Sequence, residues 1–141
     1  MNKDESGFSL VEMLIVVGII GLLAAIAIPL LRKAKNQADS GSAIATVRTL
    51  VSAERLYQLK NSKYTDLAGL VPEGTLDTTV QAGLKSGYVF SVTAVGASAD
   101  QFTVNADPMD ADTSLRHFFA DETAVIRANV GAAADSTSAP L

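Results

Sequence analysis

The sequence predicts an α+β fold in which one long N-terminal helix packs on a small antiparallel sheet of about four strands. Two observations carry this prediction. Residues 8–60 contain a single proline, and their second half shows apolar residues at helical spacing. Residues 88–128 instead contain short stretches rich in β-branched and aromatic residues, separated by hairpin-sized gaps. At 141 residues, the chain is long enough for one modest domain besides its N-terminal segment.

The composition argues against several classes of function. The net charge is −4, with 15 acidic against 11 basic residues and no extended basic patch, so no direct nucleic-acid binding is predicted. The chain has no cysteine and therefore no disulfide. With one histidine, a zinc site or a histidine-based catalytic centre would have few ligands or bases to use.

The most unusual feature of the chain is its apolar N-terminal segment. Residues 13–31 are 19 consecutive residues without a charge. Counted from Phe8 to Leu31 the segment has 24 residues, which is about 36 Å of helix. A bilayer core needs roughly 20 such residues, so the length suits a membrane span. The one charged residue in this segment is Glu12.

Two simple explanations of the segment compete with a more specific one. A secretory signal peptide would fit Ala25-Ile26-Ala27, which resembles its cleavage site, but the preceding residues MNKDES are not clearly positive. A plain membrane anchor would tolerate Glu12, because Ser9 and Glu12 match a capping box in which both side chains satisfy the first helical N–H groups. Capping explains why Glu12 is tolerated, but not why the chain needs it.

The more specific explanation comes from the stretch Gly7-Phe8-Ser9-Leu10-Val11-Glu12. It closely resembles the processing motif of type IV pilins and of the pseudopilins of type II secretion. The resemblance implies that residues 1–7 are a leader, that a prepilin peptidase cuts between Gly7 and Phe8, and that Phe8 is then N-methylated. It also implies that residues 8–31 form the membrane-spanning and filament-core half of the long helix. The resemblance is looser beyond Leu31.

Within this resemblance, Glu12 has a physical role. The new α-amine of Phe8 has a reference pKa of about 7.7–8.0 and is substantially charged near neutrality. An unpaired charge inside a bundle of helices is very costly, and Glu12 lies one helical turn away. The resemblance implies that the ion pair forms between neighbouring subunits. Because misaligned packing would leave both charges unpaired, Glu12 is predicted to set the register of assembly.

Two further questions about the segment stay open at this point. Pro29 removes a helical N–H, and together with Gly21 it permits either a kink in a continuous helix or local melting between these two residues. The basic residues after the span are Arg32, Lys33 and Lys35. The rule that positive charge stays cytoplasmic would place the leader outside, whereas processing as in the resembling family requires it inside.

The remainder of the chain is predicted to form the small domain. Residues 32–60 continue the helix with an amphipathic face, and 61–87 form a connecting loop with one short helix near 78–84. The sheet is expected over 88–128, with strands at 88–95, 101–105, 115–119 and 124–128. Residues 129–141 are expected to be a flexible tail. The apolar face of the amphipathic part consists of Ile44, Val47, Leu50, Val51 and Tyr57.

One loop contains enough oxygen ligands to suggest calcium. Asn105, Asp107, Asp110 and Asp112 lie within eight residues, although their spacing is not that of an EF-hand and Pro108 stiffens the loop. A solvated turn is the simpler interpretation, and no other cofactor is expected. His117 follows on a predicted strand, where a lone histidine is usually structural or exposed.

The sequence thus predicts a structural filament subunit, with no catalytic residues and no enzyme activity. The resemblance implies a precursor in the bacterial inner membrane that is cleaved, methylated and polymerised into an extracellular pilus-like filament. Its partners would be copies of itself, membrane lipid before assembly, prepilin peptidase and the assembly machinery. The alternative within the family is a pseudopilin in a periplasmic pseudopilus. The alternative from another class is a membrane-anchored envelope domain that binds a ligand or catalyses a reaction.

Overall fold

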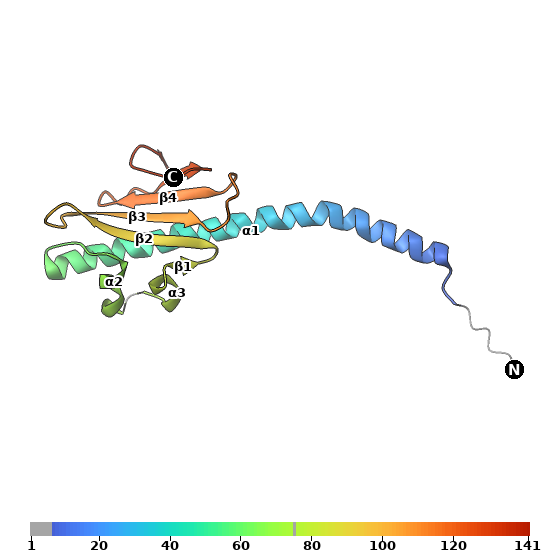
Figure 1. Cartoon of the computed structure of the whole chain (residues 1–141), viewed down its shortest axis with the longest axis horizontal. Coiled ribbons are helices and arrows are strands. Elements are labelled where there is room, and N and C mark those ends of the chain that lie inside the picture. The colour runs from blue at the N-terminus through green and yellow to red at the C-terminus, as the bar shows by residue number, and fades with distance from the viewer. Residues whose placement is uncertain (1–6, 75) are drawn as a thin grey trace. The chain divides into compact units, whose positions relative to one another are not determined.

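The computed structural model describes residues 7–74 and 76–141. It divides into two compact units, Met1–Asn36 and Gln37–Leu141, which are described separately below. Of the expected leader, only Gly7 falls within the described residues. The structure confirms the α+β fold class, with a long N-terminal helix and an antiparallel sheet (Figure 1).

Helix α1 is the dominant element and runs from Leu10 to Asn61, a length of 52 residues. The long helix expected over residues 8–31 and 32–60 is therefore present. It remains helical through Pro29, although proline offers no N–H to the carbonyl four residues earlier. The isolated chain thus adopts the continuous form of the two alternatives. Melting near Pro29 in an assembled state stays a prediction.

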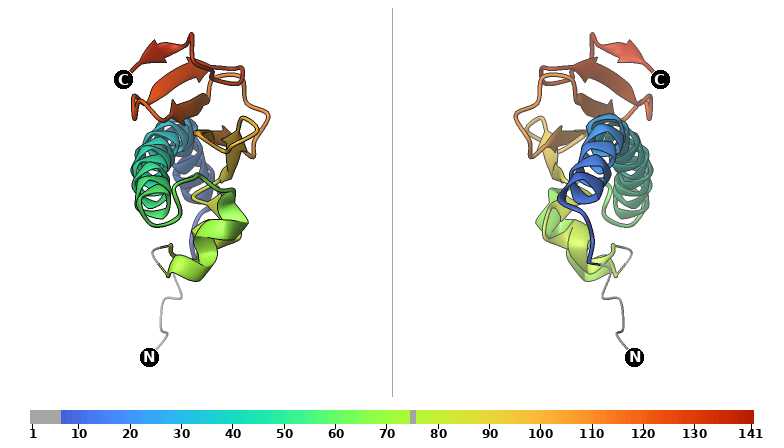
Figure 2. Two further views of the ribbon diagram at one scale, coloured as in Figure 1. Left: turned by 90° about the vertical axis from the view of Figure 1, so that its left-hand side faces the viewer. Right: turned by 90° about the vertical axis from the view of Figure 1, so that its right-hand side faces the viewer.

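In the second unit, α1 buries one face against the sheet. The buried positions recur at intervals of three and four residues, which is the spacing of one helical face. Ile44 and Tyr57 are partly buried against the same core, so the expected apolar face is confirmed. Viewed along the helix, the sheet covers this face of α1 (Figure 2). The buried residues of α1 are Ala43, Thr46, Val47, Leu50, Val51, Ala53 and Glu54.

The sheet has six antiparallel strands, and each strand pairs with its neighbour in sequence. Its longest ladder joins β2 to β3, in register from Tyr88↔Pro108 to Val95↔Gln101. Side chains alternate along β2, with Tyr88, Phe90 and Val92 buried and the residues between them exposed. The strands are β1 (Leu84–Lys85), β2 (Tyr88–Val95), β3 (Gln101–Pro108), β4 (Arg116–Asp121), β5 (Arg127–Val130) and β6 (Ala139–Pro140).

The sheet is thus larger than the predicted four strands over 88–128. Strand β1 lies in the segment expected to be a connecting loop, and β6 lies in the segment expected to be a flexible tail. The tail is fixed by pairing with β5 and by a hydrogen bond from the Arg127 guanidinium to the Ser138 carbonyl, at 3.1 Å. A two-residue strand has no alternation to read in the sequence, because it exists only through its partner.

Among the described residues, three short helical turns lie between α1 and the sheet. They are α2 (Leu67–Leu70), η1 (Val71–Glu73) and α3 (Thr78–Gln81). Asp66 caps α2 by accepting from the Gly69 N–H at 2.9 Å, and Asp77 caps α3 by accepting from the Thr79 N–H. The short helix expected near 78–84 corresponds to α3, which ends three residues earlier.

Candidate assembly site on the N-terminal helix

The first turn of α1 is closed by a reciprocal cap. The Ser9 hydroxyl accepts from the Val11 N–H at 3.3 Å, and Glu12 Oε2 accepts from the Ser9 N–H at 2.9 Å. The Ser9 carbonyl accepts the first helical hydrogen bond, from the Met13 N–H, at 3.2 Å. Ser9 and Glu12 thus cap the helix reciprocally, as expected from a capping box, except that the Ser9 hydroxyl binds the second helical N–H and not the third. This cap holds the Glu12 carboxylate at the positive end of the helix dipole, where negative charge is stabilised.

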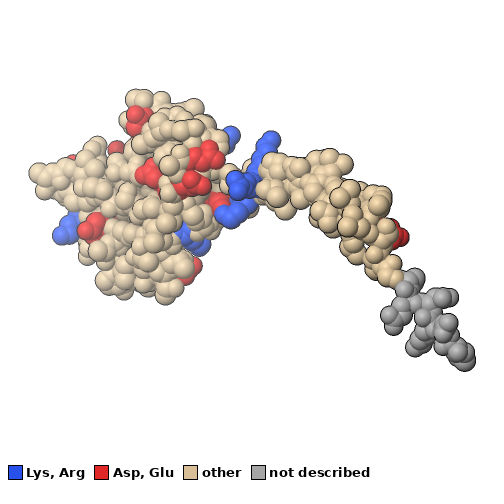
Figure 3. All heavy atoms as spheres, turned by 45° about the vertical axis from the view of Figure 1, so that its right-hand side comes forward, with Lys and Arg blue, Asp and Glu red and all other residues tan. Residues whose placement is uncertain are grey.

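Glu12 is the one ionisable side chain among residues 8–31, and it is exposed. In the space-filling view, this part of α1 is tan except for one acidic patch (Figure 3). Phe8 precedes Glu12 by four residues and its side chain is 80% exposed. The structure thus presents an acid and an aromatic residue together at the start of an otherwise apolar surface.

The apolar surface extends from Phe8, just before α1, along the helix to Leu31, and is here called the apolar segment. Its large side chains are 47–81% exposed. Of the described residues, only α1 contains a window long and apolar enough to cross a membrane, with a mean hydropathy of 2.9 and none of the window buried. Fully burying one such side chain contributes about 1.5–3 kcal/mol, so covering the segment is worth on the order of tens of kcal/mol.

The exposed residues of the segment are Phe8, Leu10, Val11, Met13, Leu14, Ile15, Val16, Val17, Ile19, Ile20, Leu22, Leu23, Ile26, Ile28, Leu30 and Leu31. A surface of this size is far more than soluble monomers leave exposed, and it indicates contact with lipid or with other protein. A Cβ added at either of the two glycines inside it, Gly18 and Gly21, would meet nothing within 4 Å beyond the adjacent helix backbone. They leave room for close approach by another helix.

The apolar segment ends at a group of bases. Arg32, Lys33 and Lys35 follow within four residues, and all three are exposed. Basic side chains gather on α1 just after the uncharged run (Figure 3). Such a charge boundary is what fixes the end of a membrane span, because Arg and Lys side chains reach the headgroup level while their carbon chains stay in lipid.

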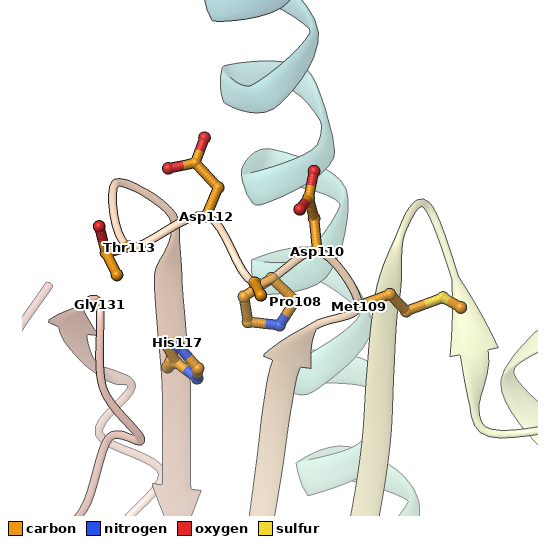
Figure 4. A pocket seen from close by; sticks show the side chains of 8 residues that line it. Pro108, Met109, Asp110, Asp112, Thr113, His117 and Gly131 are labelled. Atoms are coloured by element: carbon orange, nitrogen blue, oxygen red, sulfur yellow. The ribbon is translucent and has the colours of Figure 1, made fainter.

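In the loop that suggested calcium, Asp107 and Asp112 bind different partners. Asp107 Oδ1 lies 2.6 Å from His117 Nδ1, across the β3–β4 pair. Asp112 Oδ1 accepts from the Ser114 N–H at 2.8 Å, and this hydrogen bond holds the pKa of Asp112 below its usual range. The carboxylates of Asp110 and Asp112 point away from His117 (Figure 4). Asn105 pairs within the sheet, opposite Ser91 and Phe119.

A hollow of about 330 Å³ lies beside this loop, between Pro108, His117 and Gly131. Within residues 7–74 and 76–141, no three side chains of His, Cys, Asp or Glu are grouped so that they could hold a metal ion. Calcium binding by Asp107, Asp110 and Asp112 therefore stays a prediction of the sequence.

Sequence reasoning missed two polar features of the second unit. The first is the pair of Asp107 and His117, which face each other on adjacent strands. The second is Glu54, which is fully buried in α1. Glu54 continues the apolar spacing of Val47, Leu50 and Val51, so its position in that series was a signal that it faces the core.

An exposed apolar half-helix with a capped acid at its start, continued by a helix half that packs on an antiparallel sheet, defines a pilin-like protein. Comparison with known proteins agrees. A family model for the prokaryotic N-terminal methylation motif matches residues 2–28, a range that includes Gly7, Phe8 and Glu12. The chain belongs to the family of type IV pilins and type II secretion pseudopilins.

Three relatives illustrate the match. The chain is 33% identical over 105 residues to the type IV wide pilus major component PilA4 of Thermus thermophilus, with 74% of each chain covered. It is 32% identical over 108 residues to the type II secretion system core protein G of Escherichia coli, again with 74% of each covered. It is 37% identical over 75 residues to the type IV major pilin protein PilA of Myxococcus xanthus, which covers 51% of this chain and 34% of that relative.

Proposed function

We propose that the chain is a structural subunit of a type IV pilus-like filament. The observation that carries this proposal is the apolar segment near the capped acid Glu12, which the described residues leave exposed. Lipid covers the segment in the precursor, and the same segments of neighbouring copies cover it in the filament. Relatives named as a pilus major component and as a secretion-system core protein support a structural rather than an enzymatic role.

Assembly in this proposal starts with removal of residues 1–7. Prepilin peptidase cuts between Gly7 and Phe8, and the methylated α-amine of Phe8 remains basic. Gly7 has no side chain, and a Cβ added there would meet no described atom within 4 Å beyond its chain neighbours, so its backbone is open to an enzyme. Glu12 of a neighbouring subunit then neutralises the amine as the apolar segments pack side by side. The precursor resides in the inner membrane, and the assembly machinery extracts it into the filament.

The same chain could serve a pilus or a pseudopilus, and relatives of both kinds match it over similar lengths. We favour the pilus, with a pseudopilin of type II secretion as the second candidate. Shearing cells and identifying the released filaments by peptide mass spectrometry separates the two. A surface pilus releases this chain in long filaments from wild-type cells, whereas a periplasmic pseudopilus leaves it in the cell envelope.

Replacing Gly7 with valine is expected to block processing, because the branched side chain prevents close approach of the peptidase to the scissile bond. Intact-mass spectrometry of the membrane fraction should then find the unprocessed chain starting at Met1. The wild type should instead start at a methylated Phe8. Ser6→Ala, a change at the adjacent leader residue, serves as the matched control and should be processed. Native filaments whose subunits still begin at Met1 would contradict the proposed function.

A further inference from the structure

Glu54 is a carboxylic acid enclosed in the core of the second unit. Its side chain is 0% exposed and lies on the face of α1 that packs against the sheet. Glu54 Oε2 accepts from the Thr65 N–H at 3.2 Å. Its other oxygen, Oε1, is buried without a hydrogen-bond partner. Buried polar atoms are nearly always paired, so this half-satisfied carboxyl requires an explanation.

The Thr65 N–H belongs to the segment that connects α1 to α2, residues 62–66, here called the strap. Ser62 has a φ of 56°, in the left-handed region that non-glycine residues seldom adopt. Tyr64 donates its N–H to the Ala99 carbonyl at 2.8 Å, and its ring lies 4.7 Å from that of Phe102, between centroids. The strap is therefore held at one place by an aromatic contact with the sheet, and at the next residue by Glu54.

The charge of Glu54 is poorly compensated in this closed arrangement. Burial raises the pKa of Glu54 to about 7, and repulsion from Asp66 acts in the same direction. The hydrogen bond from Thr65 opposes the shift but does not outweigh burial. Water can supply the hydrogen bonds that Glu54 lacks in the core. Moving the strap away from Glu54 therefore stabilises its charged form more than its neutral form.

The surrounding elements supply no cation to Glu54 within the described part of the chain. On α1 itself, Arg55 donates to the Glu122 carbonyl and Lys60 pairs with Glu73. In the strap, Lys63 is exposed. The titratable group on the buried face of the sheet is Tyr88, whose hydroxyl bonds with Ser40 and with the Arg116 carbonyl. The short helices α2 and α3 contribute Leu70 and Val80 to the core.

We propose that Glu54 is a proton-controlled latch for the strap. The neutral carboxyl keeps residues 62–66 closed on α1, and ionisation favours a locally opened form in which the carboxylate is hydrated. The direction in which pH changes closure of the strap follows from proton linkage. The closed form binds the proton more tightly than the open form, so closure is favoured at low pH and is lost as pH rises from about 4.5 through about 7. This latch is a property of the folded unit and does not depend on which filament the chain forms.

The test is amide hydrogen exchange of the full chain in detergent micelles at pH 6 and pH 8, corrected for the intrinsic exchange rate. Protection of the Thr65 amide is expected to fall about tenfold between these pH values, because opening is coupled to loss of one proton. Protection of the β3 amides should exceed that of Thr65 at both pH values, because opening of the whole sheet costs more free energy than opening of the strap alone. Glu54→Gln, which cannot ionise, should remove the pH dependence at Thr65.

Asp66→Asn provides a second variant that leaves Glu54 in place. Asparagine keeps a side-chain oxygen for capping α2 but removes the charge that repels the ionised Glu54. The closed strap should therefore tolerate ionisation better, so the loss of Thr65 protection between pH 6 and pH 8 should shift to a smaller value. Were Glu54→Gln not to fold, this shift would still test the latch. Thr65 protection that is independent of pH, or that equals the protection of the β3 amides at both pH values, would overturn the proposal. A loss of Thr65 protection in Asp66→Asn as large as in the wild type would do the same.

Discussion

Replacing Glu12 with glutamine is expected to abolish filament formation, while the precursor still inserts into the membrane and loses its leader. Glutamine retains a side-chain oxygen that can cap the Ser9 N–H, so the first turn of α1 should survive. What it removes is the negative charge that, in the proposed filament, neutralises the amine of Phe8 in a neighbouring subunit. An unpaired amine would then be buried among apolar helices, at a cost of several kcal/mol per subunit.

Ser9→Ala is the matched control for this variant. It removes the hydroxyl that accepts from the Val11 N–H, which costs about 1 kcal/mol of helix stability, and it leaves the Glu12 charge unchanged. Filaments counted by electron microscopy of sheared material should therefore be absent for Glu12→Gln and present for Ser9→Ala. Wild-type filament numbers in Glu12→Gln would show that Glu12 serves only as a cap. Loss of filaments in both variants would locate the defect in the cap.

Phe102→Ala is expected to destabilise the second unit by about 3–5 kcal/mol, the usual cost of truncating a buried aromatic side chain. Phe102 is 0% exposed on β3, and its ring contacts Tyr64 of the strap. Removing it leaves a cavity between α1 and the sheet and also frees the strap. The free energy of unfolding can be measured by urea titration of the full chain in detergent, with circular dichroism as the signal.

Val89→Ala is the control, because Val89 lies on the neighbouring strand with its side chain 42% exposed and directed to the opposite face. Its effect should stay within about 0.5–1 kcal/mol, as for most partly exposed positions. Equal losses for Phe102→Ala and Val89→Ala would mean that the core does not lie between α1 and the buried face of β3.

The helix and the long strands could be predicted from the sequence because each carries its own local pattern. Residues 43–54 repeat apolar side chains at helical spacing, and Tyr88–Val95 alternates buried and exposed side chains. Strands β1 and β6 could not be predicted, since two residues define no period and each strand forms only because a neighbour is available. Their existence is a tertiary property of the sheet.

The functional candidates likewise include residues that the sequence could predict and residues that it could not. Gly7, Phe8 and Glu12 lie within six residues of sequence, so a local motif was sufficient to propose them. Glu54 and its partner Thr65 are eleven residues apart and meet only after the chain turns back on α1. Burial of Glu54 was also not expected from the sequence, because acidic residues on a helix normally face solvent. A search for charged residues at core spacing would have found it.

The connectivity of the sheet bears on how quickly the domain forms. Because all six strands pair only with their neighbours in sequence, every hairpin closes a short stretch of chain and loses little loop-closure entropy. Low contact order of this kind is associated with fast folding. Strand pairing can therefore advance one hairpin at a time, whereas the contacts of the sheet with residues 43–54 of α1 join segments that lie far apart in the sequence.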